Sequence, residues 1–247
     1  MNLLNPITHF LAHFLDYCLQ NHRSHRFNKS KASGLSIAIA LCLVTLGILT
    51  TPVLADYSPE SLYTSDGLRY QIEGDTVSIL GCNSDVIVNN DTLIIPDTIG
   101  GLLVTKIEKQ AFKERRNFKK VMLPKELESI GAFAFTKTKL QKFHAPASLK
   151  TLGLGAFSHC KALKMVDLSK SQIAMIKAFT FSGCAKLKKV LLSENIKEID
   201  DFAFWIDKKI TVIENLNDTV NIHPYAFAQC ESVKHPLIEK VMLEIKR

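Results

Sequence analysis

The sequence has few of the residues that mark several classes of protein. Its 247 residues include only 8 prolines, 11 glycines and one tryptophan, while 47% of the residues are apolar. This composition excludes a disordered linker and a collagen-like fibre. There is no phosphate-binding glycine loop, zinc box or calcium loop, and the histidines after residue 55 have no recurrent Ser or Cys partner. The sequence therefore predicts a chain that is not an enzyme, with no cofactor and no metal.

Acidic residues are nearly absent from the first 55 residues, which hold one aspartate, Asp16, and four basic side chains. An uncharged apolar run over 35–55 is long enough to cross a hydrocarbon layer of about 30 Å. It ends in Val53-Leu54-Ala55, which suits a signal-peptidase site. We predict a long basic leader over 1–34 and a signal-peptide core over 35–55, cut after Ala55.

The alternative to cleavage is an N-terminal membrane anchor, because a leader of 34 residues is longer than an ordinary one. The basic flank keeps the N-terminus inside in either case, so residues 56–247 are expected to be secreted or displayed on the cell surface. Without the leader, which holds four of the 31 basic and one of the 24 acidic residues, the net charge falls from +7 to about +4. Nucleic acid is therefore not predicted as a partner, and membrane contact is limited to an uncleaved N-terminal segment.

A unit of 22–24 residues repeats through the rest of the chain. Each copy carries Ile-x-x-x-Ala-Phe or a close variant, followed by an alternating apolar pattern that is typical of a strand. A fixed period of this length predicts a solenoid whose units stack on one another. The expected fold is mainly β: about six coils that form a parallel sheet, with short helical turns carrying the repeat phenylalanine. The six phenylalanines are Phe112, Phe135, Phe157, Phe181, Phe204 and Phe227.

Units such as LESIGAFAF (127–135), LGAFSHCKALKMVDLS (154–169) and IKAFTFSGCAKLKKVLLS (176–193) resemble the BspA-like class of leucine-rich repeats. The resemblance covers residues 92–247. It implies a secreted or surface-displayed protein, and some members of this class bind extracellular host proteins and mediate adhesion. We therefore expect a non-catalytic binding protein; the alternative is a structural or envelope-associated scaffold that makes mainly self-contacts.

Both ends of the solenoid are predicted to carry caps. Within 56–91 and up to the first coil, alternating runs joined at Gly74 and at Asn89-Asn90-Asp91 predict β-hairpins. At the other end, residues 240–243 repeat the Lys-Val-Met-Leu sequence of 120–123. We predict a closing strand there, preceded by an insertion over 234–238.

Three of the four cysteines after residue 55 occupy one inward-pointing slot, three positions after the repeat phenylalanine; they are Cys160, Cys184 and Cys230. Cys160 and Cys184 belong to consecutive coils about 5 Å apart, close to the separation that a disulfide tolerates. Export would permit the bond. A ladder of buried thiols that act as small apolar side chains is the alternative.

Two surfaces are candidates for binding. On each strand the residues beside the inward side chain face the concave side, where they include a column of lysines with Met and Leu alongside. This column would suit an unknown extracellular protein or acidic ligand. The alternative is that the concave side is simply a solvated face. The concave candidates are Lys120, Met122, Lys142, His144, Met165, Lys189, Leu191 and Lys240. On the convex side Trp205 and Ile206 stand where other coils have mainly polar residues, so they form either a contact patch or a site covered by 234–238 or by the loop around Asn215.

Overall fold

The computed structural model describes residues 62–83 and 88–244, which lie in the second of two compact units, 59–247. The predicted leader, the apolar run over 35–55 and the cleavage after Ala55 lie outside the described residues. Within the described part of the chain, no helix has both the length and the apolar character needed to cross a membrane.

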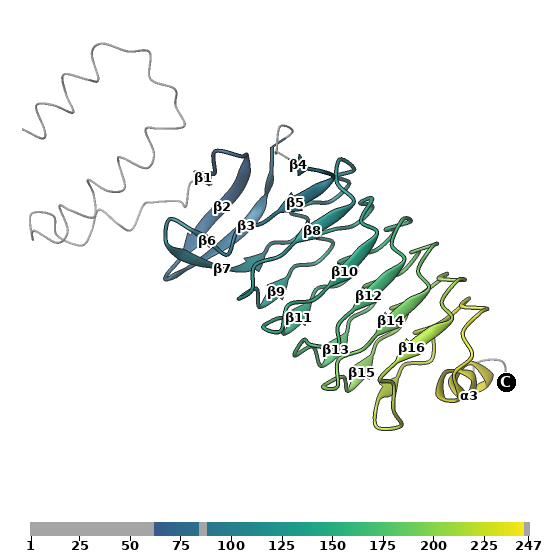
Figure 1. The fold of residues 1–247 in the computed structure, drawn as a ribbon. Coiled ribbons are helices and arrows are strands. Elements are labelled where there is room, and N and C mark those ends of the chain that lie inside the picture. Colours follow the sequence, from purple (N-terminus) through teal and green to yellow (C-terminus); the bar gives the residue numbers. More distant parts are fainter. Residues whose placement is uncertain (1–61, 84–87, 245–247) are drawn as a thin grey trace, which may run out of the picture. The chain divides into compact units, whose positions relative to one another are not determined.

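The repeats form a solenoid whose successive coils lie side by side (Figure 1). The longer strands of neighbouring coils pair in parallel, with Phe143, Val166, Val190 and Ile213 opposite one another. The shorter strands form parallel ladders on the other side of each coil. The longer strands are β5 (Thr92–Ile94), β8 (Lys120–Met122), β10 (Lys142–His144), β12 (Met165–Asp167), β14 (Lys189–Leu191) and β16 (Val212–Glu214). The shorter ones are β9 (Ser129–Ile130), β11 (Thr151–Leu152), β13 (Met175–Ile176), β15 (Glu198–Ile199) and β17 (Asn221–Ile222).

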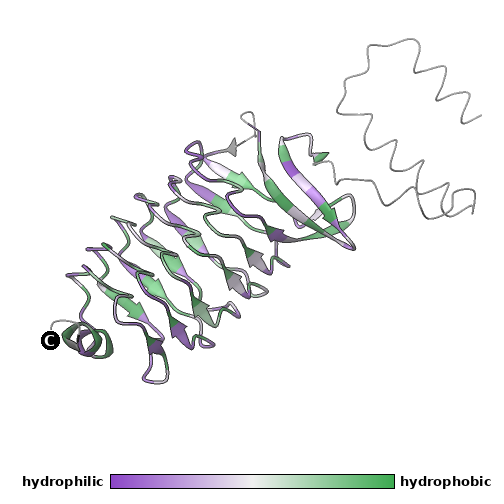
Figure 2. Ribbon diagram, turned by 180° about the vertical axis from the view of Figure 1, so that it is seen from behind, coloured by the Kyte–Doolittle hydropathy of each residue, from purple (hydrophilic) through white to green (hydrophobic). Residues whose placement is uncertain are grey.

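The core is a continuous column of the six repeat phenylalanines. Successive rings stack with centroids 4.9–5.6 Å apart and planes within 19° of parallel. Apolar residues recur on the strands of successive coils (Figure 2). The inward residues of the longer strands are fully buried except Val121 and Ile213, which are partly buried. We number the coils 1 to 6 by these phenylalanines, from Phe112 to Phe227. The predicted parallel solenoid is confirmed.

The segment that carries each phenylalanine is a pair of turns. In coil 2 the amide of Thr136 donates to the carbonyl of Phe133 and the amide of Thr138 to that of Phe135, at 3.2 and 3.3 Å. Residues two before and two after the repeat phenylalanine have a φ near +60° in most coils. A left-handed residue interrupts an α-helix, so the turns predicted as helical close as β-turns instead. At Gly155 the geometry also requires glycine, because a Cβ there would lie 2.4 Å from the Phe133 ring.

The segment before the first coil contains several antiparallel hairpins, two of which involve the predicted turns at Gly74 and Asn89-Asn90-Asp91. Strands β2 (Leu68–Glu73) and β3 (Thr76–Cys82) are antiparallel, and β3 pairs in parallel with β7 (Leu102–Ile107). Strands β4 (Val88–Asn89) and β5 form the second hairpin, whose turn residues Asn90 and Asp91 have φ values of 48° and 60°. Two-residue turns of this kind match the twist of antiparallel strands. The remaining strands are β1 (Leu62–Tyr63) and β6 (Thr98–Ile99).

The predicted C-terminal closing strand is wrong. The segment instead forms helix α3 (Pro236–Glu244), so Lys240 lies on a helix and outside the strand ladder. Proline suits the first position of a helix, and buried Ile238 with half-buried Val241 and Met242 follows helical spacing. The four residues Lys-Val-Met-Leu are compatible with the spacing of a strand or of a helix, and the preceding Pro236 favours the helix.

Candidate functional site

The outward side of β5, β8, β10, β12, β14 and β16, which we call the strand face, collects seven of the eight predicted concave residues. Strand register aligns their side chains in two columns within β5 and β8 and again within β10, β12, β14 and β16, and β8 lies beside β10. The first column is Thr92, Lys120, Lys142, Met165, Lys189 and Val212, and the second is Ile94, Met122, His144, Asp167, Leu191 and Glu214. Lys240 is the exception, because it lies on α3.

The positive charge of the strand face is concentrated toward its N-terminal coils. Lys189 Nζ lies 2.7 Å from Glu214 Oε1, so its charge is partly neutralised. His144 Nδ1 lies 3.4 Å from an oxygen of Asp167. Partial burial opposes ionisation of Asp167, but hydrogen bonds from Ser169, together with His144, outweigh it and lower the pKa of the carboxyl group. Among the described residues no carboxylate lies within 4 Å of the ammonium groups of Lys120 or Lys142.

Apolar side chains stand exposed beside these cations. Met122 is 59% exposed and Ile94, its partner on the neighbouring strand, 43%. Val212 at the other end of the face is 39% exposed. The exposed apolar side chains beside these lysines make this patch the candidate surface for binding.

Trp205 and Ile206 are both half-buried. The Trp205 ring meets Phe202 edge-on, with centroids 6.1 Å apart. Phe202 in turn stacks between Phe179 and Tyr225 at 5.3 and 5.5 Å, so a second aromatic column runs outside the core. The repeat pattern did not predict this column, although an aromatic residue two positions before the repeat phenylalanine marks it in coils 4, 5 and 6.

The cysteines of the inward slot form a thiol ladder. Cys82, Cys160, Cys184 and Cys230 are all free. Each slot thiol donates a hydrogen bond to the phenylalanine carbonyl of the preceding coil: Cys160 to Phe135, Cys184 to Phe157 and Cys230 to Phe204, at 3.0, 3.3 and 2.9 Å. Of the two alternatives that the sequence left open, the structure therefore has the ladder and not the disulfide.

Asp207 occupies the same slot in coil 5. Its side chain is fully buried, and neither carboxylate oxygen has a hydrogen-bond partner among the described residues. Burial raises the pKa of the Asp207 carboxyl group to about 8. The same buried group adds to the effect of desolvation on Cys230, whose thiol has a pKa raised to about 12.

The slot thiols should resist modification in the folded protein. Burial raises the pKa of Cys160 to about 11 and that of Cys184 well above its usual value, and only the thiolate reacts readily. We expect iodoacetamide to modify half-buried Cys82 before Cys160, Cys184 or Cys230, and all four to react after denaturation. Site-resolved mass spectrometry measures this order. A bond between Cys160 and Cys184 would instead protect both after denaturation without reductant.

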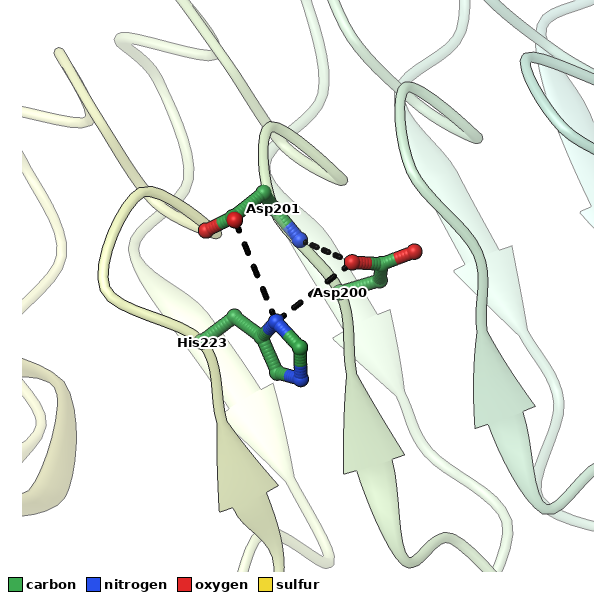
Figure 3. A group of neighbouring side chains, drawn as sticks. All are labelled: Asp200, Asp201 and His223. Atoms are coloured by element: carbon green, nitrogen blue, oxygen red, sulfur yellow. Dashed lines mark hydrogen bonds and ion pairs between the residues drawn. The ribbon is translucent and has the colours of Figure 1, made fainter.

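A further cluster joins coils 5 and 6 at the ends of β15 and β17. His223 Nδ1 lies 3.5 Å from Asp200 Oδ1 and 3.9 Å from Asp201 Oδ2 (Figure 3), and its Nε2 lies 2.8 Å from Glu198 Oε1. These are ligand types that divalent metals accept. However, Asp200 already accepts the backbone N–H of Asp201 at 2.7 Å, and Asp201 accepts that of Tyr225 at 3.0 Å. We interpret the cluster as a set of side-chain and turn contacts that ties the last two coils together.

Known structures share this architecture. A leucine rich repeat protein of T. pallidum is 19% identical with a TM-score of 0.55, and the match covers 74% of this chain and 95% of that one. A leucine rich cell surface protein of Faecalibacterium prausnitzii is 22% identical with a TM-score of 0.60 over 73% of this chain and 55% of that one. A leucine-rich repeat protein of Eubacterium ventriosum is 19% identical with a TM-score of 0.51 over 71% and 54%. The chain thus spans about half the length of the last two. No curated protein matches it.

The strand ladder, the phenylalanine column and the inward thiol slot together define a leucine-rich-repeat solenoid. Six copies of the BspA type leucine rich repeat region match residues 104–239, which is more than half of the chain. The chain belongs to this family, and the resemblance inferred from its repeat units is confirmed.

Proposed function

We propose that this chain is a non-catalytic binding protein, secreted or displayed on the cell surface, that recognises an acidic extracellular protein through its strand face. The observation that carries the proposal is the pair of lysines without carboxylate neighbours, Lys120 and Lys142, beside exposed Met122 and Ile94. Positive charge steers an acidic partner, and the apolar side chains contribute contact area once the partner is seated.

The location is supported by two independent features. The sequence predicts an export signal that ends at Ala55. One protein with the same fold, from Faecalibacterium prausnitzii, is itself a cell surface protein. A solenoid of stacked coils offers a long regular surface to a protein partner, which suits adhesion or recognition outside the cell.

Changing Lys120, Lys142 and Lys189 together to glutamate should weaken capture of the partner by about tenfold or more, because it reverses the charge of the face. The measurement has two steps. Proteins are captured by cross-linking from a mixture of extracellular proteins and identified, and the affinity of each identified protein for the chain is then determined. The matched control changes Lys170, Lys177 and Lys197 to glutamate; these exposed lysines lie outside the strand face, and the change in net charge is the same.

Proteins that bind the wild type and the control but not the strand-face variant would support the proposal. Equal capture by all three would refute it. If size-exclusion chromatography shows a stable assembly of the chain that excludes every external protein, the scaffold alternative replaces it.

A further inference from the structure

Positive charge also gathers along one edge of the solenoid, in the turns that lead from each repeat phenylalanine to the next longer strand. There the side chains of coils 1 to 4 line an open groove of about 560 Å³. The groove is distinct from the strand face, since none of its lining residues belongs to a strand. Its lining residues are Arg116, Lys137, Thr138, Lys139, His159, Lys161, Ala162 and Lys186.

The groove is short of compensating negative charge. Its lining includes no carboxylate among the described residues. One carboxylate stands beside it: Glu114 Oε1 lies 2.8 Å from Lys137 Nζ. Lys139, Lys161 and Lys186 remain exposed, and they come from three consecutive coils. On coil 5 Lys208 is paired with Glu231 at 2.9 Å, and neither Lys208 nor its neighbour Lys209 lines the groove.

This arrangement fits a linear ligand with repeated anionic groups. Coils whose strands are paired lie about 4.8 Å apart, so the cations form a row along the solenoid and do not converge on one point. The groove contains no large apolar side chain to anchor a protein partner. His159 is its only ring, so it lacks the series of aromatic platforms on which the bases of a nucleic acid stack.

We propose that this groove binds a sulfated polysaccharide chain, laid along the solenoid across coils 1 to 4. Sulfate esters stay ionised at every physiological pH and offer several acceptor oxygens to lysine and arginine. The lysines that line the groove present aliphatic stems as well as charges to the sugar rings between the sulfate groups. The inference rests on the extracellular location proposed above, and it assigns a second ligand to a separate surface.

Heparin is the probe for this site. The full chain should bind it at physiological ionic strength, with an affinity that falls steeply as salt is added. Changing Lys139, Lys161 and Lys186 together to serine should weaken binding by about tenfold or more and flatten the salt dependence. The matched control, Lys170, Lys177 and Lys197 to serine, removes the same charge elsewhere and should stay within about twofold of wild type. Circular dichroism checks that both variants are folded.

Three outcomes would overturn the proposal: no heparin binding by the wild type, an equal loss in both variants, or undiminished binding after removal of the sulfate groups. Competition with equal efficiency by single-stranded DNA or by polyglutamate would also overturn it in favour of an unspecific polyanion surface. The two proposals are separated by measuring whether the variant with Lys139, Lys161 and Lys186 changed to serine still captures a protein partner. If that capture persists while heparin binding never occurs, the groove assignment fails and the strand-face function stands.

Discussion

Replacing Phe157 with alanine is expected to lower the free energy of unfolding by about 3–5 kcal/mol. The ring is fully buried and stacks between Phe135 and Phe181, with centroids 5.3 and 5.6 Å away, and its centroid also lies 4.4 Å from that of Phe143. Its loss would leave a cavity at the centre of the stack and weaken both coil interfaces at once, and such interfaces hold a solenoid together. Urea unfolding followed by circular dichroism measures the change, and a broader transition would show that the two halves unfold separately.

Phe179 provides the matched control. It is also a phenylalanine stacked on a ring of the next coil, but it lies in the outer column and is 36% exposed. Phe179→Ala should therefore cost clearly less than Phe157→Ala. Equal losses at both positions would show that the inner column is not the main source of stability.

Replacing Asp207 with threonine is expected to stabilise the protein and to change its response to pH. Threonine already fills this slot in coil 2, where Thr138 is buried beside Cys160. The carboxyl pKa is about 8 in the folded chain and near 3.8 when exposed, so between these values folding requires the uptake of a proton. Wild-type stability should therefore fall by about 1.4 kcal/mol for each pH unit from pH 4 to pH 8, from this group alone.

The test compares urea unfolding of wild type and Asp207→Thr across this range. The difference in unfolding free energy should be small near pH 4, grow toward pH 8 and then level off. Asp207→Asn is the control for charge: it should remove the pH-dependent difference but gain less stability, because an amide in this slot remains without partners. Wild-type and Asp207→Thr curves that run parallel would mean that the carboxyl group is ionised or solvated in the folded protein.

The phenylalanine column was predictable because the repeat imposes one environment on every copy. A residue found at the same position of six units must face the same neighbours in each coil. The thiol slot was predictable only in part, since cysteines on adjacent coils are near enough either for a disulfide or for a ladder. The structure decides this through the direction of each thiol, which points to a phenylalanine carbonyl.

The surface features depend on alignments between coils that a linear pattern does not show. Arg116, Lys139 and Lys186 stand four, four and five residues after their phenylalanines, and they line one groove only once coils of unequal length are stacked. The C-terminal helix escaped prediction for another reason. Pro236 favours the start of a helix, and this local preference outweighs the likeness of 240–243 to an earlier strand.

The two ends of the solenoid differ in how they could meet another chain. At the first coil β3 pairs with β7, and the antiparallel strand β2 covers the next edge. At the last coil β16 and β17 each pair on one side only among the described strands, and a helix follows them in place of a further strand. Parallel strands with an open side accept a new strand readily. An added chain would therefore find an open side on β16 and β17 at the C-terminal end, and on the two-residue strands β1 and β4 at the N-terminal end.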